Sequence, residues 1–144
     1  MDTRNLLFTD LYELTMAQAY WLCGRADEEA VFHLSCRGSV PGAASVLSCG
    51  QAAVRQWWNQ LAPGRADLDY LADLPAGDGS ALLRQDFVET LAGLDWSAVR
   101  IDAVPEGTAV RPGSPLLRVY GPLLQAQLLE TGLLNLMGYA SQVA

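Results

Sequence analysis

Lysine is absent from this sequence of 144 residues, in which all nine basic residues are arginine. A lysine amine is needed for Schiff-base chemistry, for a lysine general base and for a phosphate-binding P-loop, so this chain cannot supply any of them. Histidine occurs only at His33. A zinc site within the chain is therefore not expected, and the sequence shows no Ser-His-Asp set, no glycine-rich loop between strand and helix and no paired carboxylates flanking a base.

Cysteine is scarce as well, with Cys23, Cys36 and Cys49 as the complete set. An odd number without metal-ligand spacing indicates reduced thiols in a reducing compartment. The N-terminus lacks a basic stretch followed by an apolar one, and the most apolar stretch, 123–144, is interrupted by polar residues. We therefore expect no signal peptide, no membrane span and a cytoplasmic location.

Positive charge is also in deficit, since the formal net charge is -7. A nucleic-acid partner is not expected, because it would require a basic stripe, although a local arginine cluster can still bind a phosphate-bearing small molecule. Half of the residues (51%) are hydrophobic and 17% are charged, which is typical of a globular chain. This length predicts a single domain, 1–144, with a core of its own.

The first predicted element is a helix over 9–22. Thr9 or Asp10 can cap it, Glu13 has the spacing of a capping box with Asp10, and Gly24 ends it. Two apolar faces follow from the helical period. One carries Leu11, Leu14, Gln18 and Trp21 toward the core, and the other presents Tyr12, Met16, Ala19 and Tyr20 to something else.

The middle of the chain predicts a strand over 30–35, a turn at 40–42 and three helices, at 51–61, 67–72 and 82–91. Side chains expected to point inward are Val54, Trp57, Trp58 and Leu61 in the first of these helices, and Leu83, Phe87 and Leu91 in the last.

The C-terminal part changes character. Short strands at 99–103, 108–111 and 116–120, separated by Pro-Gly turn signals, predict a compact β-meander. A long helix is then expected over 122–144, with proline in its first turn and a narrow polar line through Gln127, Glu130 or Thr131, and Asn135. This helix has no glycine or other residue pattern that would end it, and we interpret this as a sign that the domain is interrupted. The fold class is α+β: helices with a small β-meander or sandwich.

Two residues stand out as candidates for binding. Arg37 ends the predicted strand beside Gly38, where a guanidinium can hold a phosphate through two hydrogen bonds; a surface salt bridge is the alternative. Tyr12 can stack on a ligand, or it can belong to a core or an interface. By contrast, His33 is interpreted as a packed or surface histidine, and 27–29 as a solvated loop, because three consecutive carboxylates cannot all face one ion.

Several ordered motifs resemble the nicotinate phosphoribosyltransferase family. They cover nearly the whole chain, most weakly between 60 and 95, and comprise Thr9-Asp10-Leu11-Tyr12-Glu13-Leu14-Thr15-Met16-Ala17, Tyr20-Trp21, Gly24-Arg25-Ala26, Val104-Pro105-Glu106-Gly107-Thr108, Pro112-Gly113-Ser114-Pro115-Leu116-Leu117, Gly121-Pro122-Leu123-Leu124, Gln127-Leu128-Leu129-Glu130-Thr131, Leu133-Leu134-Asn135 and Tyr139-Ala140-Ser141.

The resemblance implies an N-terminal domain like that of quinolinate and nicotinate phosphoribosyltransferases, without the (β/α) barrel that follows it. Family members join nicotinate to phosphoribosyl pyrophosphate, giving nicotinate mononucleotide for NAD salvage, with ATP hydrolysis and Mg²⁺. Their active site lies at a dimer interface. By the resemblance, Tyr12 stacks on the nicotinate ring of a neighbouring chain and Arg37 lies near the phosphoribosyl pyrophosphate, while Mg²⁺ and ATP bind mainly outside this chain.

Two departures accompany the resemblance. The family's Phe-Phe-Arg segment and its Pro-Phe-Gly-Gly-like turn are replaced by the different sequence at 34–42, which retains Arg37. Family members are also several hundred residues long, so we expect this chain to act with a barrel polypeptide, within a homo- or hetero-oligomer, and to be inactive alone. The alternatives are a degenerate dimerisation or regulatory module and a subunit acting on another aromatic acid.

Overall fold

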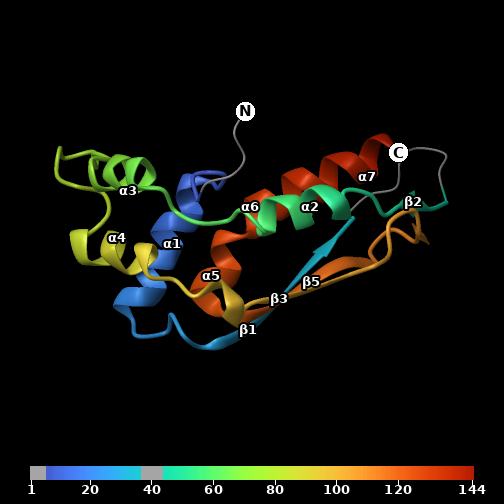
Figure 1. Cartoon of the computed structure of the whole chain (residues 1–144), viewed down its shortest axis with the longest axis horizontal. Coiled ribbons are helices and arrows are strands. Elements are labelled where there is room, and N and C mark those ends of the chain that lie inside the picture. Colours follow the sequence, from blue (N-terminus) through green and yellow to red (C-terminus); the bar gives the residue numbers. More distant parts are fainter. Residues whose placement is uncertain (1–5, 37–43) are drawn as a thin grey trace.

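The computed structural model describes residues 6–36 and 44–144 (Figure 1). Arg37 and the turn expected at 40–42 lie outside these ranges. The helices are α1 (Leu11–Leu22), α2 (Gln51–Trp58), α3 (Arg65–Ala72), α4 (Gln85–Ala92), α5 (Leu123–Leu128), α6 (Glu130–Leu133) and α7 (Tyr139–Val143), with a 3-10 turn η1 (Trp96–Ala98) and a π-helical segment η2 (Leu134–Gly138). The strands are β1 (Glu29–Ser35), β2 (Val46–Leu47), β3 (Arg100–Ala103), β4 (Ala109–Val110) and β5 (Pro115–Pro122).

The main sheet is antiparallel with strand order β1-β5-β3. Val119, in the centre of β5, pairs with Phe32 of β1 on one side and with Ile101 of β3 on the other. The predicted meander is wrong, because β4 leaves this sheet and pairs with β2. Two backbone hydrogen bonds, from Ser48 N to Thr108 O (2.9 Å) and from Gly107 N to Ser48 O (2.8 Å), hold the chain before β4 against the chain after β2. These partners are distant in sequence, so the local alternation could not reveal them.

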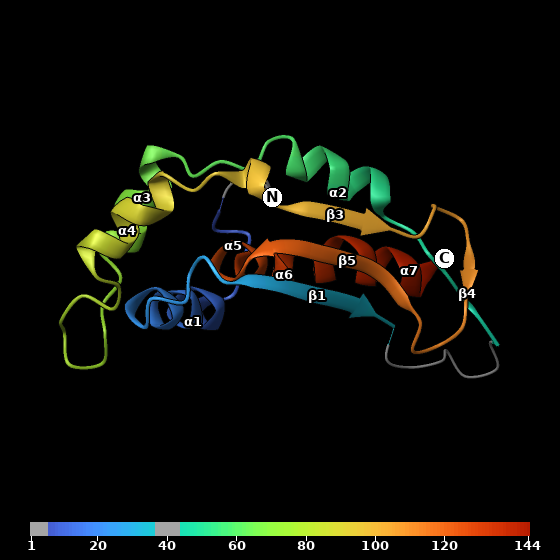
Figure 2. The same cartoon turned by 90° about the horizontal axis from the view of Figure 1, so that it is seen from below.

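One face of the sheet is covered by the C-terminal helices, as Figure 2 shows. Alternating side chains of the strands meet α2 and the C-terminal helices in a first hydrophobic cluster, whose buried members include Leu34, Trp57, Leu117, Val119 and Met137. Three of the inward positions expected in 51–61 are buried, with Trp58 partly so. The opposite face carries residues such as Val31 and Arg118, which are exposed.

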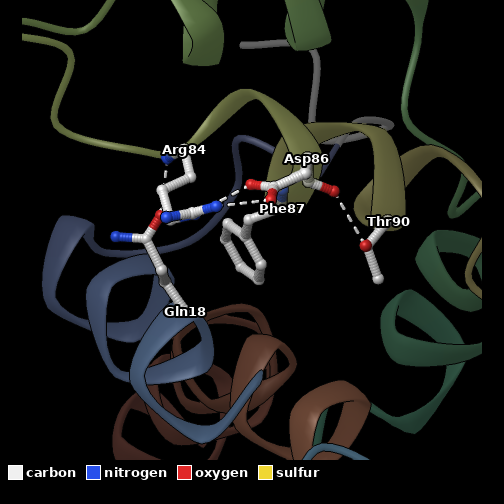
Figure 3. A network of polar contacts seen from close by, with 5 residues as sticks. All are labelled: Gln18, Arg84, Asp86, Phe87 and Thr90. Carbon is white, nitrogen blue, oxygen red and sulfur yellow. Dashed lines mark hydrogen bonds and ion pairs between the residues drawn. The ribbon is translucent and has the colours of Figure 1, made fainter. Parts of the chain in front are cut away.

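A second hydrophobic cluster lies at the other end of the molecule, where α1, α3, α4 and α5 meet. The expected inward residues Leu83, Phe87 and Leu91 are all buried in it. Gln18 connects α1 to the start of α4: its Oε1 accepts the Arg84 backbone N–H at 2.6 Å, and Arg84 in turn forms an ion pair with Asp86 at 2.6 Å (Figure 3). The C-terminal half of α1 is thereby fixed against α4.

Helix α1 ends as the sequence predicts. Gly24 has φ +69°, and the N–H groups of Gly24 and Arg25 donate to the carbonyls of Trp21 (3.0 Å) and Tyr20 (2.9 Å), which is a Schellman motif. The beginning differs, because Asp10 is the N-cap but makes no side-chain capping bond. The predicted core face is also wrong at Leu11, which is 52% exposed, whereas Glu13 is completely buried.

The last helix is not the single helix predicted over 122–144. Its helical path is interrupted at Leu129 and again by the π-helical η2. Close to the first interruption, the Thr131 backbone N–H donates to Glu13 Oε1 at 2.9 Å. A carboxylate from α1 therefore contacts the backbone of the C-terminal helix at the place where its path is interrupted.

The mixture of helices and small antiparallel sheets confirms the α+β class. No helix in the described ranges combines the length and the apolar character needed to cross a membrane.

Candidate functional site

Tyr12 lies in the first turn of α1 with 46% of its surface exposed. Its neighbours Leu11 (52%) and Met16 (38%) are also exposed, so the outer side of α1 presents a small apolar surface with an aromatic ring in it. A soluble helix normally turns such residues inward, because exposed apolar area is unfavourable in water. The predicted outer face of α1 is confirmed as accessible, and its partner stays a prediction.

The hydroxyl of Tyr12 is anchored on the last helix. It donates to Glu130 Oε1 at 2.9 Å, while the closest oxygen of Glu13 is farther away, at 3.4 Å. Glu130 is itself held by Gln127, whose Nε2 donates to Glu130 Oε2 at 3.0 Å and whose side chain is only 2% exposed. The ring is thus tied to a residue 118 positions away in the sequence.

Beneath Tyr12, the Glu13 carboxylate forms a buried polar centre. Its Oε1 accepts the backbone N–H of Thr131 (2.9 Å) and the hydroxyl of Thr131 (2.7 Å), and its Oε2 accepts the hydroxyl of Thr9. The Thr131 hydroxyl also lies 2.9 Å from Asp10 Oδ2. These contacts join the start of α1 to the start of α6. The spacing of Glu13 from Asp10 predicts a capping box instead, so the local sequence does not reveal this role of Glu13.

The electrostatics of this region are acidic. Burial raises the pKa of Glu13, the nearby charge of Glu130 adds to this, and the hydrogen bonds from Thr9 and Thr131 oppose it. The pKa of Tyr12 is also raised well above its ordinary value. Partial burial is the largest cause, and the hydrogen bond to Glu130 and the charges of the surrounding carboxylates act in the same direction. Tyr12 therefore remains a protonated donor throughout the neutral range. Within the described ranges no arginine forms an ion pair with Asp10, Glu13 or Glu130.

A hollow of about 260 Å³ lies next to Glu130, between β1 and the C-terminal helices. Most of its lining residues are apolar, among them Phe32, Leu133 and Leu134, and His33 also lines it. A larger groove, of about 950 Å³, lies between α2 and β3 and contains none of the residues bound to Tyr12. The smaller hollow is the one that adjoins the Tyr12 network.

The other candidate residues of the sequence analysis do not take part in the hydrogen bonds around Tyr12 that the structure describes. His33 is exposed on β1, which agrees with its interpretation as a surface histidine. In the acidic stretch 27–29, Glu28 pairs with Arg25 at 2.7 Å on the surface. Arg37 lies outside the described residues, so its proposed contact with phosphate stays a prediction. In the part of the chain that the structure describes, no three His, Cys, Asp or Glu side chains are grouped to hold a metal ion.

The arrangement supplies an accessible aromatic ring whose hydroxyl is hydrogen-bonded to the partly buried Glu130, with the buried Glu13 carboxylate beside it. Such a ring can stack on a flat ligand and orient it, since aromatic groups contribute both area and geometry.

Comparisons with known proteins agree with this domain. Residues 7–138 match the nicotinate phosphoribosyltransferase (NAPRTase) N-terminal domain family, and the chain belongs to that family. Nicotinate phosphoribosyltransferase of Bos taurus is 44% identical over 139 residues, which are 96% of this chain and 25% of that protein. The homologue of Homo sapiens is also 44% identical, and the Mycobacterium tuberculosis protein named nicotinate phosphoribosyltransferase pncB2 is 36% identical.

The crystal structure of human nicotinic acid phosphoribosyltransferase superimposes with a TM-score of 0.81 at 43% identity. The match covers 94% of this chain and 26% of the human chain. The fold is therefore the α+β N-terminal domain of a nicotinate phosphoribosyltransferase-like enzyme. The chain spans about a quarter of the length of the relatives that it matches.

Proposed function

We propose that this chain forms the N-terminal part of a nicotinate phosphoribosyltransferase, which joins nicotinate to phosphoribosyl pyrophosphate and gives nicotinate mononucleotide for NAD salvage. The observation that carries the proposal is Tyr12, an accessible ring on α1 whose hydroxyl is fixed by Glu130 at 2.9 Å. In this role Tyr12 stacks on the pyridine ring, and the exposed apolar surface around it faces the barrel of a neighbouring chain in an oligomer.

The chemical contribution of this domain is positioning. Glycosyl transfer to a ring nitrogen requires the acceptor nitrogen to be held in line with the ribose carbon, and fixing that geometry removes much of the entropic barrier. A rigid aromatic surface supports the flat acceptor from one side. Arg37 is proposed to hold phosphate through its guanidinium, and Mg²⁺ and ATP are proposed to bind mainly at residues outside this chain.

The decisive experiment compares the isolated chain with a complete enzyme, meaning this chain combined with a barrel domain of the nicotinate phosphoribosyltransferase family. We expect nicotinate mononucleotide to form only in the complete enzyme, because the residues described here provide one side of a site. Product is measured with nicotinate and phosphoribosyl pyrophosphate, with and without ATP and Mg²⁺. A complete enzyme that forms no nicotinate mononucleotide would contradict the function, and turnover by the isolated chain would contradict the need for a barrel. Substituting other aromatic acids for nicotinate tests the substrate.

Replacing Tyr12 with alanine in the complete enzyme should raise KM for nicotinate roughly 10- to 100-fold, as removal of an aromatic stacking partner does elsewhere. The stability of the fold should change little, because the ring is half exposed. Tyr70→Ala is the matched control: Tyr70 lies on α3 and is 57% exposed. Steady-state kinetics for both variants provide the test, and equal KM values for Tyr12→Ala and the unmodified enzyme would remove Tyr12 from the site.

A further inference from the structure

We propose that Glu130 is a positioning residue, which holds the Tyr12 ring in the orientation that receives the pyridine ligand; this inference rests on the proposed function. A tyrosine near the start of an exposed helix face has two rotatable side-chain bonds. Ordering such a side chain when a ligand binds costs free energy, and a side chain that is already ordered avoids this cost. Glu130 orders Tyr12 before any ligand is present.

The geometry identifies Glu130 as the partner of the phenol. A tyrosine hydroxyl has one hydrogen to donate, and Glu130 Oε1 is at 2.9 Å whereas Glu13 Oε1 is at 3.4 Å. The Glu13 oxygen is also already occupied by the N–H and the hydroxyl of Thr131. Glu130 therefore holds the hydroxyl, and Glu13 lies beneath it with its acceptor capacity in use.

Glu130 is in turn fixed from its other side. Gln127 donates to Glu130 Oε2 at 3.0 Å, and the Gln127 side chain is nearly completely buried on α5. The two hydrogen bonds that Gln127 and Tyr12 donate to Glu130 thus connect the buried core to an accessible ring. The interruption of the helix at Leu129 lies between Gln127 and Glu130, next to the contact of Thr131 with Glu13.

Three variants can separate the effect of the Tyr12–Glu130 hydrogen bond from the effect of the negative charge of Glu130. Glu130→Gln retains an oxygen acceptor for the phenol without the charge, whereas Glu130→Ala removes both. Tyr12→Phe retains the ring and removes only the donor. If Glu130 acts through the hydrogen bond, Glu130→Ala and Tyr12→Phe remove one and the same interaction, so their effects are not additive.

In the complete enzyme, we expect Glu130→Ala and Tyr12→Phe each to raise KM for nicotinate about fivefold with kcat nearly unchanged. The double variant should be no worse than either single one, and Glu130→Gln should stay within about twofold of the unmodified enzyme. Glu89→Ala, which removes an exposed carboxylate from α4, is the control for loss of charge. A normal KM in Glu130→Ala, or additive effects in the double variant, would overturn the inference. A normal KM in Tyr12→Ala would instead contradict the proposed function.

The contact itself can be tested on the chain alone. With ¹³Cζ-labelled tyrosine, the Tyr12 signal is assigned by its loss in Tyr12→Phe. We expect this signal to move in Glu130→Ala and to stay in place in Glu89→Ala. A Tyr12 signal that is indifferent to Glu130→Ala would overturn the inference whatever the kinetics show, and the thermal midpoint of each variant establishes that it is folded.

Discussion

Replacing Gly50 with alanine should destabilise the fold by about 3–5 kcal/mol, from the combined cost of a strained backbone and an overpacked contact. Gly50 precedes α2 with φ +102°, a conformation that residues with a side chain rarely adopt. An added Cβ would also lie 2.4 Å from the carbonyl oxygen of Leu136 and 3.0 Å from the Cα of Met137. Both are backbone atoms of η2, so relief would require the C-terminal helix to move away from α2.

Gly138→Ala is the matched control, because Gly138 follows Met137 in the same segment. Its φ is -60°, and no atom lies within 4 Å of the position that a Cβ would take. Alanine there should be neutral or should stabilise by up to about 1 kcal/mol, since it is the better helix former. Urea unfolding of both variants measures the difference. Similar stabilities for Gly50→Ala and Gly138→Ala would show that the loop before α2 does not pack against η2.

Replacing Glu13 with alanine should cost about 3 kcal/mol. The substitution leaves the N–H of Thr131 and the hydroxyl of Thr9 without their acceptor, while the Thr131 hydroxyl retains Asp10 Oδ2 at 2.9 Å. An unsatisfied buried polar group costs about 1–3 kcal/mol. The substitution also leaves a void where a completely buried side chain was. Glu13→Gln retains an acceptor oxygen of similar shape, so it should lose less. Equal losses for alanine and glutamine, measured by unfolding at neutral pH, would argue against the hydrogen-bonding role of Glu13.

The pH dependence of the glutamine variant follows from the raised pKa of Glu13, whose first cause is burial. A carboxyl whose pKa is higher in the folded state binds its proton more tightly when folded. Its contribution to stability is complete below the unfolded pKa, about 4.3, and is lost as the pH rises through the folded value. The unmodified chain should therefore lose stability relative to Glu13→Gln as the pH rises above about 4.3, the ordinary pKa of a glutamate. Unfolding both proteins below and above this pH tests the sign, and a difference that grows in favour of Glu13 would contradict it.

Local patterns were sufficient for much of the fold. The helical period located α2 and α4 and their buried side chains, because a packed helix face repeats at a fixed spacing. Gly24 marked the end of α1, since only a residue without a side chain adopts that φ at no cost. The ordered motifs, taken together, also led to the family to which the chain belongs.

Long-range contacts decided the rest. The sequence determined that α1 would carry Tyr12 on an outer face, because that depends on helical spacing alone. Only the tertiary structure determined that Glu13 is buried, that Thr131 takes it as an acceptor and that the last helix is interrupted there. A glutamate is expected at a surface unless the fold brings donors to it, and Thr131, which supplies two of the three donors, lies 118 residues away. The pairing of β4 with β2 and the hydrogen bond between Tyr12 and Glu130 were likewise not predictable from local patterns, because these partners are close in space but distant in sequence.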